Sequence, residues 1–192
     1  MNIRGKLIAA FIAAGITAAS SFVAYDLTLP SEGFKNKVYS DPVGLPTVCV
    51  GHMDKNLRLG QSFSDEDCLN LFAKDWVKHQ KQLDSLVKVA YASEWQRAAL
   101  TDFTFNVGIG NVRSSTLIKL LNQGRHEEAC IQLLRWNKAG GRVLRGLVIR
   151  RENTLPYCLG KVSADKQKSY EEFIKEWENE MAKRLEKDSK NL

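Results

Sequence analysis

The sequence lacks the features that mark several common classes of protein. Its four cysteines include no C-x-x-C pair and its three histidines are scattered, which argues against a structural zinc site. It contains no dense run of lysine and arginine with interleaved aromatic residues, so we expect no nucleic-acid partner. There is no internal repeat and no low-complexity stretch. We therefore expect neither a metal nor another cofactor, and we expect a monomer.

What is present is enough for a sizeable core. The chain has 192 residues, of which 44% are hydrophobic and 26% charged, and this suits one domain with a small subdomain or appendages. The net charge is +6. Residues 161–192 hold eight basic and eight acidic side chains, so the whole excess lies in residues 1–160. This distribution favours a basic face toward an anionic polymer or a membrane surface.

The first 26 residues contain a weakly apolar segment. Arg4 and Lys6 precede 19 uncharged residues, 7–25, of which 11 are Ala, Gly, Ser or Thr. As a helix this run would nearly span the roughly 30 Å hydrocarbon layer of a bilayer, with its N-terminus in the cytoplasm. Three interpretations remain open: an uncleaved weak anchor, a cleaved signal peptide, or a buried helix of a soluble protein. The first two send the chain out of the cytoplasm.

The cysteines fit an exported protein. Cys49, Cys68, Cys130 and Cys158 form an even set, which permits two disulfides in any of three connectivities. Sequence alone does not choose among them, and four unpaired buried thiols are the alternative.

The pattern of the chain predicts an α+β protein. A short helix is expected over residues 27–34, followed by a hairpin whose strands, 37–40 and 45–50, flank a type I turn at Asp41-Pro42-Val43-Gly44. Helical periodicity begins at Ser64, a predicted cap, and dominates from there, with a first helix to about Val89, a basic loop at 137–142 and an amphipathic helix after Gly160. We expect a small β-hairpin subdomain, a larger helical subdomain and a cleft between them.

Two carboxylates and a hydroxyl surround the predicted hairpin. Glu32 stands at the end of the first helix, Asp41 begins the turn, and Thr47 follows on the second strand. Glycoside hydrolysis needs one carboxylic acid that protonates the leaving oxygen and one carboxylate that supports the reacting centre or a water molecule. Asp41 also has a purely structural interpretation, because Asp side chains accept hydrogen bonds from backbone amides in such turns.

The order of these residues resembles a known signature. Glu32, eight residues, Asp41, five residues, Thr47 and then Val48-Cys49-Val50-Gly51-His52 is similar to the catalytic region of the bacteriophage-type lysozymes, glycoside hydrolase family 24. Further stretches resemble the same family over about residues 27–160, namely Ala98-Ala99-Leu100, Phe105-Asn106-Val107-Gly108, Ser115-Thr116-Leu117 and Gly146 to Glu152.

The resemblance implies a lysozyme-like fold and a muramidase acting on peptidoglycan glycan strands. Glu32 would be the general acid. Asp41 and Thr47 would place or activate water on the far side of the sugar ring, or Asp41 would stabilise the developing cation, in a reaction usually described as inverting. For His52 the resemblance favours a structural hydrogen bond near the site. Three further residues are expected to bind substrate, on weaker grounds: Asn106, Arg142 and Arg145.

The N-terminus resembles one branch of that family, the signal-anchor-release endolysins, which are held at the inner membrane and become active on release into the periplasm. This implies three segments: an anchor at 1–26 that enters the inner membrane through residues 7–25, a lysozyme domain at 27–160 and a charged helical tail at 161–192. Some members carry a cysteine at the position of Asp41 and switch by disulfide exchange; this chain has Asp41 there and no cysteine in its N-terminal segment, which argues against that switch. A secreted lysozyme with a cleaved signal and a non-catalytic peptidoglycan-binding protein are the alternatives.

Overall fold

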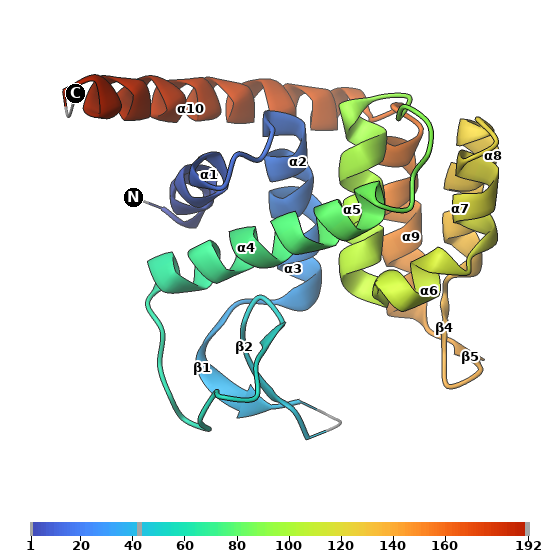
Figure 1. Cartoon of the computed structure of the whole chain (residues 1–192), viewed down its shortest axis with the longest axis horizontal. Helices are drawn as coiled ribbons and strands as arrows, with labels where there is room; N and C mark the ends of the chain where they lie inside the picture. The colour runs from blue at the N-terminus through green and yellow to red at the C-terminus, as the bar shows by residue number, and fades with distance from the viewer. Residues whose placement is uncertain (1, 42–43, 191–192) are drawn as a thin grey trace. The chain divides into compact units, whose positions relative to one another are not determined.

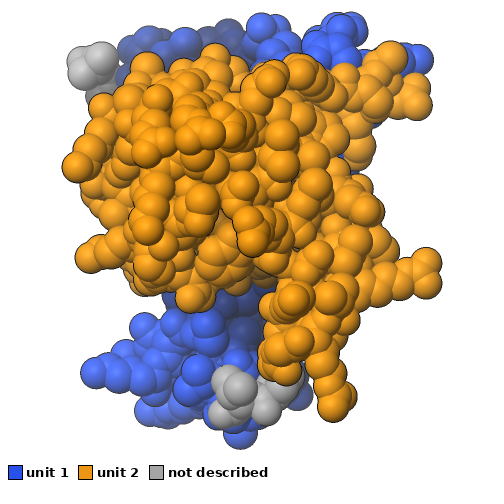
Figure 2. Space-filling model, turned by 90° about the vertical axis from the view of Figure 1, so that its right-hand side faces the viewer, with its two compact units in different colours: residues 1–77, 167–192 blue, residues 78–166 orange. Residues whose placement is uncertain are grey.

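The computed structural model describes residues 2–41 and 44–190, and it is mostly helical with two small antiparallel sheets (Figure 1). The helical majority and the small sheets confirm the predicted α+β class. Internal contacts divide the chain into two compact units, coloured separately in Figure 2. Unit 1 comprises residues 1–77 and 167–192, and unit 2 comprises residues 78–166.

Unit 1 combines a series of short helices with a sheet of order β1-β2-β3. Its short elements are α1 (Ile3–Ala13), α2 (Ala18–Val23), the π-helix η1 (Ala24–Thr28), α3 (Leu29–Glu32), β1 (Lys35–Ser40), β2 (Pro46–Cys49) and β3 (His52–Met53). Two long helices belong partly to this unit, α4 (Asp65–Asp84) and α10 (Ala164–Ser189).

The N-terminal segment is helical, but it is not one continuous helix. The helix α1 ends at Ala13, and Gly15 has a φ of +72°, a left-handed conformation that glycine adopts at little cost. The helix α2 then starts afresh, with the Thr17 hydroxyl accepting a hydrogen bond from the Ser20 amide at 3.4 Å. Among the residues that the structure describes, no helix combines the length and apolar character needed to cross a membrane.

Much of this segment contributes to the core of unit 1. Leu7 and Phe11 are fully buried. The Phe11 ring lies 5.2 Å from the ring of Phe72 and 6.0 Å from that of Trp76, both on α4. In this form, therefore, residues of the predicted anchor are packed as core residues of a folded unit.

The hairpin and the start of α4 follow the turn and capping chemistry read from the sequence. Pairs Tyr39↔Thr47 and Ser40↔Pro46 set the antiparallel register of β1 and β2. The Ser64 hydroxyl accepts a hydrogen bond from the Asp67 amide at 3.1 Å, which confirms Ser64 as a cap. The helix α4 ends at Asp84 and not near Val89, so the predicted helix is about five residues too long at its C-terminus.

Unit 2 is a helical body with a small hairpin. Its elements are α5 (Glu94–Val107), α6 (Ile109–Arg113), α7 (Thr116–Leu121), α8 (His126–Ile131), the 3-10 helix η2 (Gln132–Arg135), β4 (Lys138–Ala139), β5 (Arg142–Val143) and α9 (Arg145–Cys158). The sequence offers Ser114 or Ser115 as the cap of the helix that ends at Leu121, and the Ser115 hydroxyl caps α7 by accepting from the Ile118 amide at 3.2 Å. The basic stretch at 137–142 was expected to be a loop and instead forms the β4–β5 hairpin, whose turn contains Gly140 and Gly141, both with positive φ.

A buried ion pair joins α5 to α9 inside unit 2. Asp102 is fully buried, and its Oδ1 accepts a hydrogen bond from Arg150 Nη2 at 3.0 Å. Its Oδ2 accepts from the Thr154 hydroxyl at 3.2 Å. Because buried charges are stable only when they are paired, these contacts account for an arginine among the aliphatic residues of α9.

All four cysteines are paired, so the alternative of four buried thiols is wrong. Cys49 bonds Cys68 in unit 1, and Cys130 bonds Cys158 in unit 2. Each bond therefore lies within one unit. This connectivity is one of the three that the sequence left open.

Candidate functional site

Glu32 is placed by the end of a helix. Pro30 lies in the first turn of α3, and the helix ends at Glu32 because Gly33 takes a φ of +77°. A methyl group in place of a hydrogen at Gly51 would lie 3.6 Å from Oε2 of Glu32, so the carboxyl group reaches the turn between β2 and β3. Glu32 is half-buried there.

Asp41 and Thr47 meet at the end of the first hairpin. Ser40 pairs with Pro46, so Asp41 stands opposite Leu45, and the two exchange a backbone hydrogen bond of 3.0 Å from the Asp41 amide to the Leu45 carbonyl. Oδ1 of Asp41 accepts from the Leu45 amide at 2.8 Å. The Thr47 hydroxyl donates to the Leu45 carbonyl at 3.1 Å. One residue, Leu45, thereby holds both side chains at the same end of the sheet.

The turn itself follows the predicted pattern where it is described. The Gly44 amide donates to the Asp41 carbonyl at 3.0 Å, the hydrogen bond that joins the first and fourth residues of a β-turn. Pro42 and Val43 lie outside the described residues. Asp41 therefore has a structural role in the turn, and both its side chain and that of Thr47 bond the backbone of Leu45.

A disulfide fixes the far end of the same strand. Cys49 adopts a φ of 60°, which is uncommon for a residue other than glycine, and its sulfur bonds Cys68 in the first turn of α4. Val38, Val48, Cys49 and Cys68 form a small buried cluster beneath the sheet. The strand that carries Thr47, which is itself only 4% exposed, is therefore anchored covalently to α4.

We expect removal of this bond to lower both stability and activity. The Cys49→Ala/Cys68→Ala double variant loses a cross-link over 19 positions, which lowers the free energy of unfolding by about 3 kcal/mol. It also frees the end of β2, so the peptidoglycan cleavage that the family resemblance implies should slow several-fold. Urea unfolding and a turbidity assay on permeabilised cells measure the two effects.

The second disulfide supplies the matched control. Cys130→Ala/Cys158→Ala removes a cross-link over 28 positions in unit 2 and should cost similar stability. Its activity below the unfolding transition should stay close to that of the unmodified chain. Equal activity losses in both double variants would contradict a specific role of the first bond in holding β2.

His52 has a clear structural partner. It pairs with Val48 across β2 and β3, and its Nδ1 lies 2.7 Å from Oδ2 of Asp75 on α4. Both side chains are about one-fifth exposed. The pair links β3 to α4. Gly51 is therefore flanked in sequence by two residues that are held to α4, Cys49 before it and His52 after it. Asp75 was not predicted from the sequence, because the periodicity of α4 does not mark it. Gly51 is part of the family-like signature, but its approach to Glu32 was not predicted.

The three predicted substrate-binding residues belong to unit 2. Asn106 lies in the last turn of α5, and its Oδ1 accepts a hydrogen bond from Nη2 of Arg151 on α9. Arg142 on β5 and Arg145 at the start of α9 are both exposed. Asn106 thus has a structural contact, and the two arginines present their guanidinium groups at the surface of unit 2.

The chain is similar to several known proteins. The model of the phage lysozyme family matches residues 30–154. A SAR-endolysin of Enterobacteria phage PA-2 is 40% identical over 159 residues, which cover 80% of this chain and 94% of the relative. A SAR-endolysin of Bacteriophage PS119 is 42% identical over 128 residues, covering 67% and 76%. The crystal structure of the active form of P1 phage endolysin Lyz shares the fold, with a TM-score of 0.71 over 85% of this chain and 97% of that one at 21% identity.

Proposed function

This chain belongs to the phage lysozyme family, and on that premise we propose that Glu32, Asp41 and Thr47 carry out its reaction. The enzyme is a muramidase, a glycoside hydrolase that degrades peptidoglycan, and it acts as an endolysin. The bond cleaved is the β-1,4 linkage between N-acetylmuramic acid and N-acetylglucosamine. The observation that carries the residue assignment is the meeting of Asp41 and Thr47 at Leu45.

Glu32 is the general acid in this proposal. Its protonated carboxyl group donates a proton to the glycosidic oxygen as the bond from that oxygen to the anomeric carbon breaks. The leaving sugar departs as a neutral alcohol, and positive charge develops at the anomeric centre. The position of the carboxyl group at the end of α3 and beside the side-chain-free Gly51 supports this role, because it leaves room for a sugar oxygen to approach.

Asp41 and Thr47 act together on the attacking water. The carboxylate of Asp41 accepts a proton from the water as its oxygen bonds to the anomeric carbon, and the Thr47 hydroxyl orients that water by accepting a hydrogen bond. The Thr47 hydroxyl donates its own hydrogen to the Leu45 carbonyl, so its oxygen lone pairs are directed away from that bond. Attack opposite to the leaving group inverts the anomeric configuration.

The test of this function is the chemistry of the products. The full chain, purified from the soluble fraction, should cut isolated peptidoglycan into fragments whose new reducing ends are N-acetylmuramic acid, which borohydride converts to its alditol. Proton NMR of the first-formed product should show the α-anomer. New N-acetylglucosamine reducing ends, or free stem peptides, would rule out a muramidase. Binding without any fragment would favour the non-catalytic wall-binding alternative.

We expect the substrate contacts of unit 2 to be mainly electrostatic. Peptidoglycan carries carboxylates on its stem peptides, and the exposed guanidinium groups of Arg142 and Arg145 suit such anions. Asn106 is committed through Oδ1 to Arg151, so it contributes through its amide NH₂ group.

The release mechanism is also part of the proposal. Residues 7–25 first hold the chain in the inner membrane, and the chain then moves as a monomer into the periplasm, with residues 27–160 as the lysozyme domain and 161–192 as its tail. Two observations support this: the relatives named above are SAR-endolysins, and the same residues pack as α1 and α2 in unit 1. A segment rich in Ala, Gly, Ser and Thr leaves lipid more easily than a leucine-rich one.

A further inference from the structure

Two segments lie outside the residues matched by the family model, and they contact each other. The model covers residues 30–154, which leaves the N-terminal elements α1, α2 and η1 at one end and α10 at the other. Within unit 1, α10 runs alongside the N-terminal helices (Figure 1). The tail thus lies beside the N-terminal segment, although the two are at opposite ends of the sequence.

The contact is centred on an aromatic cluster. Phe173 of α10 is fully buried, and its ring lies 5.3 Å from the ring of Phe22 and 6.0 Å from that of Tyr25. Tyr170, one helical turn earlier, has its ring 5.3 Å from that of Phe22. Edge-on aromatic pairs of this kind stabilise a contact beyond the area that they bury. Burial also raises the pKa of the Tyr170 hydroxyl, as expected for a group taken from water.

A basic residue of the N-terminus closes the cluster. The Arg4 guanidinium lies over the rings of Tyr25 and Phe173, 5.9 Å and 5.4 Å from their centroids. Its Nε is 3.2 Å from Oε2 of Glu176, one turn beyond Phe173. Arg4 is one of the two charged residues that precede the weakly apolar run 7–25, and Phe22 and Tyr25 lie near the end of that run. The helix α10 therefore contacts the N-terminal segment near both ends of the run.

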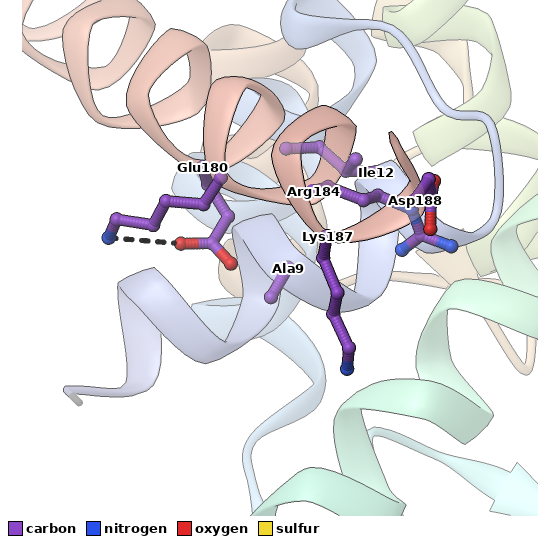
Figure 3. A pocket seen from close by; sticks show the side chains of 7 residues that line it. Ala9, Ile12, Glu180, Arg184, Lys187 and Asp188 are labelled. Atoms are coloured by element: carbon purple, nitrogen blue, oxygen red, sulfur yellow. Dashed lines mark hydrogen bonds and ion pairs between the residues drawn. The ribbon is translucent and has the colours of Figure 1, made fainter. Parts of the chain in front are cut away.

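The second half of α10 is different. Ala9 and Ile12 of α1 face a cavity of about 310 Å³, which α10 lines with Glu180, Lys183, Arg184, Lys187 and Asp188 (Figure 3). The three- and four-residue spacing of apolar residues in the sequence also places Leu185 on the apolar face of this helix; Leu185 is 64% exposed, so that part of the prediction is wrong. The ring contacts and the ion pair with the N-terminal segment described above all lie in the stretch around Tyr170, Phe173 and Glu176.

The other side of the segment rests on the family domain. Phe11 packs on α4, and Lys6 Nζ donates to Oδ2 of Asp65 at 2.8 Å. This hydrogen bond, with a second from Asn36, holds the pKa of Asp65 below its ordinary value of 3.8. These contacts do not involve α10, so substitutions in α10 test its contribution separately.

We propose that the first half of α10 is a docking surface for the N-terminal segment after it has left the bilayer, and that this docking drives release. The proposal rests on the release mechanism proposed above. Phe22 and Tyr25 cannot be inserted in lipid and packed on Phe173 at the same time. Any contact made only in the released state shifts the equilibrium toward that state by the free energy of the contact. The tail then competes with the membrane for residues 3–25.

Three substitutions in the full chain test the docking. Phe173→Ala removes the central ring, Phe173→Leu keeps an apolar side chain without the ring contacts, and Leu185→Ala makes the same kind of truncation at an exposed position of the same helix. After expression, the ratio of membrane-bound to soluble chain should rise at least roughly tenfold for Phe173→Ala, rise less for Phe173→Leu and stay within about twofold for Leu185→Ala.

A second measurement separates this proposal from the release mechanism. In the purified soluble chain, amide hydrogen exchange over residues 3–28 should speed up at least roughly tenfold in Phe173→Ala, less in Phe173→Leu and not in Leu185→Ala. If the unmodified chain is never found in the membrane, the anchor hypothesis fails while exchange still decides the docking. If Phe173→Ala does not fold, the membrane ratio and exchange rate of Phe173→Leu test the docking instead. Membrane ratios and exchange rates equal to those of Leu185→Ala in both Phe173 variants would overturn the proposal.

Discussion

Replacing Glu32 with glutamine should abolish lytic activity, lowering the rate of peptidoglycan cleavage by a factor of about 10³ or more. A general acid contributes roughly 10²–10⁴ to such a rate, and an amide has no proton of comparable acidity to donate to the glycosidic oxygen. Glutamine has nearly the same size and shape, so α3 and the turn at Gly51 should be preserved. Turbidity loss of outer-membrane-permeabilised Gram-negative cells measures the effect.

The matched control is the same substitution at another position of unit 1. Glu66 lies in the first turn of α4 and is exposed, so Glu66→Gln changes the net charge equally without touching the candidate site. Both variants should unfold at temperatures within a few degrees of the unmodified chain. Full activity in Glu32→Gln would refute its assignment as the acid, and equal loss in both variants would point to charge and not to catalysis.

Adding leucines to the N-terminal segment should lock the chain in the membrane and delay lysis. Each Ala→Leu change adds three carbons, and at about 0.8 kcal/mol per buried carbon it stabilises insertion by about 2 kcal/mol. Three such changes add about 6 kcal/mol, which shifts the partition toward the membrane by roughly 10⁴-fold. Fractionation over time after expression, with the onset of lysis followed in parallel, measures this shift.

The structure indicates which positions to change. Ala9 borders the cavity beneath α10, Ala13 is exposed, and Ala14 is half-buried, so larger side chains there should leave the folded unit intact. Gly15 and Thr17 are to be avoided, because the first needs a positive φ and the second caps α2. Only the inserted state should then gain stability.

The control for the leucine variant uses serine at the same three positions. Ala→Ser changes add polarity at similar size, so release should be at least as fast as in the unmodified chain. Prompt release of the triple leucine variant would contradict the anchor hypothesis. A soluble product shortened by some 20 residues would identify a cleaved signal peptide instead.

Local chemistry made parts of the fold predictable. The hairpin at Asp41 and the caps at Ser64 and Ser115 depend on side chains that bond their own neighbouring backbone, so a few consecutive residues contain the necessary information. The extent of α4 and the β4–β5 hairpin were mispredicted for a different reason. Where no cap or strong turn signal ends an element, contacts with distant residues decide its limits, and those contacts are not visible in a short window.

The candidate site shows the same division. Glu32, Asp41 and Thr47 were identified through their order and their resemblance to a family, since spacing alone also fitted a purely structural turn. Asp75 escaped notice because its significance depends on its contact with His52. Gly51 belongs to the quoted signature, but only the folded chain shows that Glu32 approaches it.

The sequence by itself determined the family, the hairpin, the likeness of its N-terminus to an anchor and the even number of cysteines, because each depends on residue types at fixed separations. Only the tertiary structure decided which cysteines pair, that many residues of the segment 7–25 are packed in the core of unit 1, and that Phe173 is covered while Leu185 is not. The physical reason is that the hydrophobic effect has no direction. It favours burial of an apolar side chain but does not specify the partner, so the surrounding residues of the folded chain determine whether that side chain lies in lipid, in the core or in solvent.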